Sequence, residues 1–462
     1  MIEANYLIIG AGAMGMAFAD ALLTETDATI AIVDRYGSPG GHWTRAYPHV
    51  RLHQPSAFYG VNSKPLGRNT KDTRGGNAGL FELASGSEVV AYFDQVMNQQ
   101  FLPTGRVHYF PMCEYAEGGA IVSLASGERH EVTGKKIVDA TYSQVTVPSM
   151  RPPAYDVADD VRCVPPNALN TIDETPSGYV VIGAGKTGID ACLWLLDAGV
   201  DPKDIAWILP RDPWILDRAK IQPGPDFFDS TVGGFALQME ASALATSIDD
   251  LFERLEATGQ LLRLDDTVRP TTYRCSTVSI AELEELRRID NVVRLGRVRS
   301  ISADEIVLEN GSIPTGPEVL HIDCTADGLA RRPAVPVFEG DRITLQNIRV
   351  CQPTFSAGLT GHVEASYTDD TQKNELCTPV PYPNSDVDWL RITLGNAVNT
   401  ARWRSDPELS AWLAGSRLDV NSSFAGRGEP SPALLQILGK LGENAAGAIT
   451  NLQKLLAEVD AE

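Results

Sequence analysis

The stretch LIIGAGAMGMAFADALL, residues 7–23, decides how the rest of the chain is interpreted. Its first residues are apolar enough for a buried strand, a Gly-x-Gly-x-x-Gly turn follows at Gly10, Gly12 and Gly15, and small and apolar residues then continue as a helix. A second strand, ATIAIV at residues 28–33, leads directly to Asp34. Together these parts make a β-α-β unit of about 30 residues, the usual size of this motif.

The chain repeats the pattern at residues 180–196, where VVIGAGKTGIDACLWLL holds Gly183, Gly185 and Gly188 at the same spacing. The ends of the two copies also agree. IVDAT at residues 137–141 and HIDCT at residues 321–325 both read as a buried strand that ends on Asp-x-Thr. We therefore predict an internal duplication and an α/β fold with two Rossmann-like dinucleotide-binding domains.

In the first copy, each glycine has a physical role. Gly10 permits the tight turn, Gly12 lets backbone amides approach a pyrophosphate, and Gly15 lets the helix pack on the strand. The helix N-terminus then faces the anion with free N–H groups and partial positive charge. Asp34 can accept from both ribose hydroxyls and repels a 2′-phosphate, so this copy predicts FAD or NAD and not NADP; the alternative is a vestigial unit without a ligand. Further contacts to this cofactor are predicted at Ala13, Met14 and Arg35.

The second copy lacks the ribose-binding acid after its next strand, residues 205–209. Arg211 stands close to where a 2′-phosphate would lie, and a guanidinium suits phosphate bidentately. Lys186 adds a cation inside the turn, next to Thr187. This copy therefore predicts NADPH, with an ion pair between Arg211 and Asp212 as the alternative role of the arginine.

These residues resemble the flavoproteins that carry two dinucleotide-binding domains. GGHW at residues 40–43 followed by YPHVR at residues 47–51 is similar to the GGxW…YPxxR segment of flavin-containing and Baeyer–Villiger monooxygenases, and RDPW at residues 211–214 is similar to their phosphate-binding turn. Residues 133–148 look like the segment that closes their FAD domain, which adds Ala140 and Thr141 to the site. The resemblance covers roughly residues 6–327 and implies FAD, NADPH and a monooxygenase-like reaction on a small organic substrate.

The chain departs from that family at three places. The FxGxxxHxxx(W/F/Y) fingerprint is missing between residues 148 and 178, His53 stands where the Baeyer–Villiger enzymes have an aspartate, and Tyr142 replaces a glycine. A flavin-dependent oxidase, dehydrogenase or reductase is therefore one alternative, and a nucleotide-binding protein without enzymatic activity is another.

His53 is the predicted catalytic residue. Beside a flavin it would donate to a carbonyl, shuttle a proton or act as a base; a loop histidine bonded to backbone is the equal alternative. Gln54 is expected in the same site. The resemblance also implies flavin contacts from the 40–51 segment, at Gly41, His42, Trp43 and Arg51.

CQPTFSAGLTGHVEA at residues 351–365 resembles the C-terminal flavin segment of many FAD enzymes. There a helix N-terminus points at the flavin, which predicts a helix beginning near Ser356, with Gln352 and Phe355 nearby; an ordinary surface helix is the alternative. This segment makes the FAD domain discontinuous, residues 1–165 plus 335–462, with an NADP domain of residues 170–330 inserted in it.

The net charge of −21 and sequence pI of about 4.8 argue against nucleic acid and anionic membranes as partners. The seven cysteines are at least 26 residues apart, which argues against a redox disulfide and a structural zinc site, and we expect no metal. An odd cysteine count and no signal peptide favour the cytoplasm. The substrate, the reaction of the reduced flavin and the oligomeric state stay open.

Overall fold

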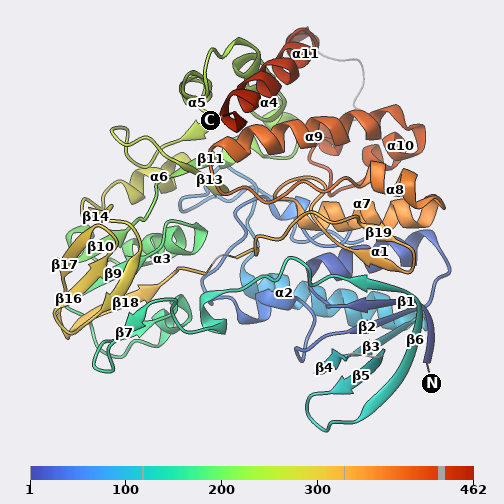
Figure 1. Cartoon of the computed structure of the whole chain (residues 1–462), viewed down its shortest axis with the longest axis horizontal. Coiled ribbons are helices and arrows are strands. Elements are labelled where there is room, and N and C mark those ends of the chain that lie inside the picture. Colours follow the sequence, from blue (N-terminus) through green and yellow to red (C-terminus); the bar gives the residue numbers. More distant parts are fainter. Residues whose placement is uncertain (1, 117–118, 327, 425–431, 462) are drawn as a thin grey trace.

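The computed structural model describes residues 2–116, 119–326, 328–424 and 432–461, and its elements form two mainly parallel sheets with helices packed on them (Figure 1). The larger sheet carries the first glycine turn. In spatial order its strands are β19 (Phe338–Glu339), β20 (Arg342–Thr344), β6 (Arg129–Asp139), β1 (Ile2–Ile9), β2 (Ile30–Val33) and β3 (Val107–Phe110). All pairs from β20 to β3 are parallel, while β4 (Cys113–Tyr115) and β5 (Ala120–Ser123) join β6 in an antiparallel ribbon.

The second sheet carries the second glycine turn and is parallel throughout. In spatial order its strands are β14 (Val292–Val293), β10 (Ile205–Ile208), β9 (Gly178–Ile182), β18 (Val319–Asp323) and β8 (Cys163–Val164). Two smaller sheets accompany it. One is β12 (Leu261–Leu262), β11 (Pro213–Asp217) and β13 (Thr272–Val278), and the other is β17 (Gly311–Pro314), β16 (Glu305–Leu308), β15 (Val298–Ile301) and β7 (Asp156–Val157).

Eleven α-helices lie in the described residues: α1 (Ala13–Glu25), α2 (Gly86–Val96), α3 (Lys186–Asp197), α4 (Phe228–Leu244), α5 (Ile248–Ala257), α6 (Ile280–Leu286), α7 (Pro353–Ser366), α8 (Asp370–Leu376), α9 (Val387–Ser405), α10 (Pro407–Gly415) and α11 (Pro432–Asp460). The helix after the first turn, α1, is buried almost all round, and its neighbour is α7. A Cβ on Gly361 of α7 would lie 2.7 Å from the Cβ of Ala21, so small residues set this close approach. None of these described helices is long and apolar enough to cross a membrane.

The two sheets repeat each other in detail. Ile9 at the end of β1 pairs with Asp139, and Ile182 at the end of β9 pairs with Asp323. Each aspartate then accepts from the threonine two residues on: the Oδ1 of Asp139 lies 2.9 Å from the amide of Thr141, and the Oδ1 of Asp323 lies 3.1 Å from the amide of Thr325. The predicted α/β fold with parallel sheets is confirmed, and Asp-x-Thr is the turn that closes each copy.

Chain segments are shared between the sheets differently from the predicted division at residue 165. β7 and β8, residues 156–164, pair with strands of the second half, whereas β20 returns to the first sheet. The C-terminal helices α9 and α11 share a hydrophobic core with α5, and α11 packs along α4. The residues expected to close the first domain therefore also cover the second half.

Candidate functional site

A cavity of about 570 Å³ opens at the first glycine turn. Gly10 has φ of +104°, which only glycine adopts readily, and a Cβ on Gly15 would lie 2.0 Å from the carbonyl oxygen of Gly10. A Cβ on Gly41 would lie 3.0 Å from the Cα of Gly12, so the segment after β2 crosses close over the turn. The glycines thus do what their spacing predicts: they let strand, helix and loop meet without side chains between them.

Many of the predicted contacts line this cavity. They are Gly10, Gly12, Ala13, Met14, Asp34, Arg35, Gly41, His42, Ala140 and Thr141. Further walls, which no sequence motif indicates, come from Tyr36, Tyr59, residues 113–115 of β4 and residues 143–146. β4 belongs to this set because the amide of Cys113 donates to the carbonyl of Asp34 (3.0 Å), a pairing that no local motif announces.

Asp34 is fixed at one end of the cavity by backbone amides. Its Oδ2 accepts from the amide of Ala11 at 2.6 Å and its Oδ1 from the amide of Tyr36 at 2.7 Å. The side chain is only 6% exposed, and this burial raises the pKa of its carboxyl against the lowering effect of the two amides. The carboxylate is therefore held rigidly where a hydroxylated ligand in the cavity would meet it.

Other predicted contacts support the cavity from behind or lie away from it. Trp43 donates from Nε1 to the hydroxyl of Tyr59 at 2.7 Å, and so positions a tyrosine that does line the cavity. Arg51 is exposed and donates from Nη1 to the carbonyl of Leu83 at 3.3 Å. Gln54 is half-buried in the same loop and is not among the residues that line this cavity.

The helix predicted to begin near Ser356 begins at Pro353 instead. The amide of Ser356 therefore donates within the helix, to the carbonyl of Gln352 at 2.9 Å, and is not available to a ligand. Phe355 is fully buried against the guanidinium of Arg349, 3.9 Å from the ring centroid. Pro353 is the residue of this segment that lines the cavity, and Gln352 is the residue before the helix.

Two histidines of the predicted site are held neutral: His42, which lines the cavity, and His53, which is not among its lining residues. Burial lowers the pKa of His53 to about 3, with a further lowering from the charges of Lys186 and Arg218. Burial also lowers the pKa of His42 to about 4. The Nδ1 of His53 is buried and has no hydrogen-bond partner among the described residues. So low a pKa makes His53 a weak base at neutral pH, whereas a neutral imidazole remains suited to hydrogen bonding.

The second glycine turn has the same construction as the first. Gly183 has φ of +132°, and a Cβ on it would lie 2.7 Å from the carbonyl oxygen of Cys324. A Cβ on Gly188 would lie 2.1 Å from the carbonyl oxygen of Gly183. Gly185, at the N-cap of α3, has open space around it. A ligand group that binds to backbone amides therefore has room at Gly185, and the N-terminus of α3 faces this position.

The loop of residues 40–51, which is predicted to contact FAD, also contacts α3, the helix after the second turn. Tyr47 donates from its hydroxyl to Asp190 of α3 at 2.7 Å, and Asp190 also forms an ion pair with Lys186. The ring of His49 packs on Trp194 of the same helix, with 5.4 Å between centroids. Lys186, the predicted cation of the turn, is thus paired with a carboxylate of its own helix.

Arg211 is free of the neighbour that was its alternative partner. Asp212 instead forms a two-point ion pair with Arg294, with nitrogen–oxygen distances of 2.9 and 3.0 Å. Arg211 donates from Nη2 to the Oδ1 of Asn384 at 3.2 Å. Burial and the charges of Arg297 and Arg331 lower the pKa of Arg211. The alternative assignment of Arg211 to a pair with Asp212 is wrong, and a cluster of positive charge remains, made of the half-buried Arg211 and the exposed Arg297 and Arg331.

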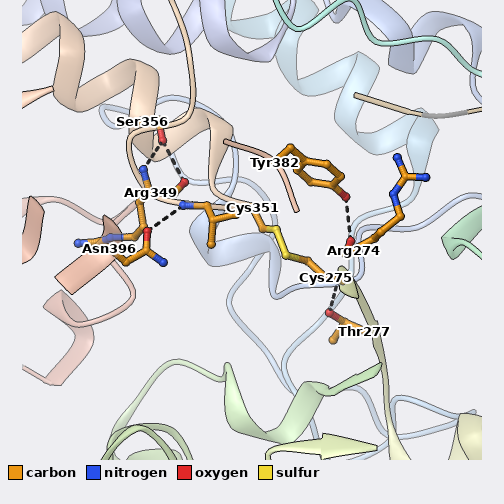
Figure 2. Close-up of a disulfide and its surroundings, with 9 residues drawn as sticks. Arg274, Cys275, Thr277, Arg349, Cys351, Ser356, Tyr382 and Asn396 are labelled. Carbon is orange, nitrogen blue, oxygen red and sulfur yellow. Dashed lines mark hydrogen bonds between the residues drawn. A yellow bond between two sulfur atoms is a disulfide. The ribbon is translucent and has the colours of Figure 1, made fainter. Parts of the chain in front are cut away.

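A disulfide joins Cys275 of β13 to Cys351, directly before Gln352 (Figure 2). Both cysteines have left-handed backbone, with φ of +56° and +58°. The cysteine spacing argues against a redox disulfide and gives no sign of this pair, because the fold alone brings together residues 76 positions apart. The other cysteines, Cys113, Cys163, Cys192, Cys324 and Cys377, are free.

The fold and the two turns define the class of protein: an α/β protein with two parallel sheets, each entered through a strand, a Gly-x-Gly-x-x-Gly turn and a helix. No family model matches the chain. The chain belongs to the family of uncharacterized protein Rv2000 of Mycobacterium tuberculosis and uncharacterized protein Mb2023 of Mycobacterium bovis. It is 55% identical to each over 419 residues, which cover 91% of this chain and 78% of the relative.

Among solved structures, the chain is similar to several flavin enzymes. The flavin-containing monooxygenase from Stenotrophomonas maltophilia has a TM-score of 0.44 at 14% identity, over 89% of this chain and 99% of that one. An FAD-bound form of OTEMO has a TM-score of 0.49 at 13% identity, over 78% and 83%. An oxidized steroid monooxygenase bound to NADP has a TM-score of 0.48 at 12% identity, over 98% of both. These TM-scores describe a coarse likeness.

Proposed function

We propose that this protein is a flavoprotein oxidoreductase that binds FAD at the first glycine turn and NADPH at the second, and uses NADPH to reduce the flavin. One observation carries the proposal: Asp34, Gly12, His42 and Pro353 line one and the same cavity. The lining thus offers an acid for the ribose and a bare glycine turn for the pyrophosphate of FAD. FAD, when bound, supplies a two-electron acceptor that the side chains lack.

The chain's own residues would hold the flavin cofactor in defined ways. Asp34 would accept from ribose hydroxyls, and the amides at the start of α1 would donate to the pyrophosphate. His42, neutral and half-buried, would face the ring system as a hydrogen-bonding group and not as a charge. For His53 we propose a positioning or donor role, because the lowered pKa makes its neutral imidazole a weak base.

Arg211 supports NADPH over NADH at the second turn. Its guanidinium has no carboxylate partner among the described residues, and Arg297 and Arg331 add to the local positive charge. A 2′-phosphate carries the charge that would balance Arg211. We also propose that the NADP half is inserted in the FAD half, since β20 returns to the first sheet after β18 has completed the second.

For the reaction, we propose monooxygenase-like chemistry on a small organic molecule, on the resemblance of residues 40–51 to flavin-dependent monooxygenases. The departure at His53 keeps an oxidase, dehydrogenase or reductase reaction as the second candidate. In both cases the site must bring nicotinamide and flavin together. The contact between Tyr47 and Asp190, which joins the FAD-side loop to α3, supports such a meeting of the two halves.

Absorbance of the purified protein tests the cofactors first. We expect a flavin spectrum, after addition of FAD if necessary, and rapid anaerobic bleaching by NADPH with much slower bleaching by NADH. A protein that takes up no FAD contradicts the proposal. Readmission of air then separates the reactions: hydrogen peroxide in an amount equal to the NADPH consumed, whatever organic molecule is present, favours the oxidase alternative over oxygen insertion.

A further inference from the structure

A second cavity, of about 260 Å³, lies beside the first and has no part in the proposed FAD site. Ser143 and Leu329 line both cavities, so the two meet at these residues. The other walls come from parts of the chain that are distant in sequence: Tyr142, residues 330–332 and Ala334 after β18, Gln346 and Asn347 after β20, residues 379–382 and Asn384 before α9, and Asp388 in the first turn of α9.

The rim of this cavity carries positive charge that no described carboxylate balances. Arg331 and Arg332 are exposed wall residues, and neither forms an ion pair with a described residue. The Nη2 of Arg331 donates to the Oδ1 of Asn384 at 2.6 Å, and Arg211 donates to the same oxygen at 3.2 Å. A neutral amide oxygen thus receives two guanidinium groups. It satisfies hydrogen bonds without neutralising charge, and it marks a position suited to an anionic oxygen.

Asp388, the carboxylate among the residues that line this cavity, does not balance the positive charge of the rim. Asp388 accepts from the amides of Asn384 and Ser385, both at 2.9 Å, and forms an ion pair with Arg391 at 3.0 Å. Arg331 and Arg332 thus lie together on the rim without acidic partners among the described residues, in a chain whose net charge is −21. The local field at the rim therefore attracts anions against the field of the whole protein.

One side-chain oxygen of the residues that line this cavity is left without a partner. The Oδ1 of Asn347 is buried and has no hydrogen-bond partner among the described residues. The neighbouring Gln346 differs, because its side-chain amide both donates to and accepts from the backbone of Val335. An unpaired buried acceptor destabilises a protein by about 1–3 kcal/mol, which a bound donor would recover. Apolar walls, such as Val380, surround this amide.

We propose that this second cavity is the substrate pocket and that it takes a small organic anion, with the carboxylate or phosphate held at the rim by Arg331. The uncharged body of the ligand would lie along Val380 and offer a hydrogen-bond donor to Asn347. The shared walls at Ser143 and Leu329 place this body next to the first cavity. The assignment as substrate rests on the proposed function, but anion binding by the pocket does not.

Calorimetric titration of the purified chain tests the pocket without any turnover. The probes are matched pairs of an acid and its amide: benzoate with benzamide, and hexanoate with hexanamide. A hydrogen bond to a charged group contributes about 1.5–3 kcal/mol, so at least one carboxylate should bind roughly 10-fold or more tightly than its amide. Arg331→Gln should remove this preference and leave amide binding unchanged.

A matched control is Arg299→Gln. Arg299 is an exposed arginine of β15, paired with Glu309 at 3.0 Å, and lies outside the cavity walls. It should leave the binding of every probe unchanged. Arg331 is exposed, so its variant should fold, and the melting temperatures of both variants verify this.

Two results overturn the proposal. One is the absence of a carboxylate preference in both pairs. The other is displacement of benzoate by adenosine 2′,5′-bisphosphate together with equal losses of affinity for that nucleotide in Arg331→Gln and Arg211→Ala, because the cluster then belongs to the dinucleotide site. Failure of the proposed function looks different: flavin uptake and bleaching by NADPH are absent while carboxylate binding persists.

Discussion

Replacement of Arg211 by alanine should weaken NADPH binding and leave NADH binding nearly unchanged. The structure gives the reason. Asp212 is committed to Arg294, so Arg211 is not neutralised by its neighbour, and its contact within the described residues is the neutral side-chain oxygen of Asn384. A 2′-phosphate would be the first full negative charge to reach this guanidinium. NADH lacks that phosphate, so the loss of Arg211 should leave its affinity nearly unchanged.

The magnitude follows from what remains in the variant. A hydrogen bond to a charged group contributes about 1.5–3 kcal/mol. Arg297 and Arg331 stay near the site and retain part of the attraction, so we expect a loss of about 2 kcal/mol. This corresponds to a roughly 30-fold rise in the Kd of NADPH. Because the phosphate contact depends on charge, the difference between the two proteins should shrink as salt is added.

Anaerobic bleaching of the flavin at increasing NADPH or NADH gives both Kd values, with Arg299→Ala as the control for loss of an arginine elsewhere on the surface. The reasoning is refuted if Arg211→Ala weakens NADH as much as NADPH, because the arginine would then support the fold of the turn and not the phosphate. It is refuted equally if neither nucleotide is affected.

Three further changes test the structure. Gly15→Ala places a Cβ 2.0 Å from a backbone carbonyl oxygen and should lower both FAD retention and the melting temperature. The control Gly439→Ala lies in α11 with open space around it, and it should stabilise the helix by up to about 1 kcal/mol. Equal effects of the two changes would contradict the packing role of Gly15. Folding lowers the pKa of His53 from 6.5 to about 3, so the unfolded chain binds a proton that the folded chain does not. The free energy of unfolding should therefore fall as the pH drops from 6.5 towards 3, by up to about 1.4 kcal/mol per pH unit, and urea titrations of His53→Asn should show a shallower fall; an unchanged slope would argue against the buried neutral imidazole. Cys275→Ser, which breaks the bond to Cys351, should lower the free energy of unfolding by about 2–4 kcal/mol. Thiol titration of the unfolded wild type should find five free thiols before reduction and seven after it. Seven free thiols without reductant would rule the disulfide out.

Local features of the site were predictable because their physics is local. Gly10 and Gly15 sit where a turn and a strand–helix contact exclude side chains, and a spacing rule expresses that exclusion directly. Asp34 follows from the end of a short apolar strand, and the cavity does reach it. The Asp-x-Thr ends of β6 and β18 also depend on hydrogen bonds only two residues long.

Features that depend on distant neighbours were not predictable. The first turn of α7 begins three residues before the predicted Ser356, and Phe355 turns into the core against Arg349. The spacing of Cys275 and Cys351 gave no sign of their pairing, because a disulfide depends on where two strands of chain meet in space. The contact of Tyr47 with Asp190, which also pairs with Lys186, likewise joins residues 143 positions apart.

By itself, the sequence determined that this protein has two β-α-β units built around glycine turns, and that they end differently, in Asp34 and in Arg211. Those properties depend on backbone geometry within a few residues. Only the tertiary structure decided the charge state of the groups around the turns. In that structure, burial keeps His53 neutral and Asp212 forms an ion pair with Arg294. Arg211 and Arg331 both donate to the side-chain oxygen of Asn384. Solvation and Coulomb interactions act through space, so they follow from the packing of segments that lie far apart along the chain.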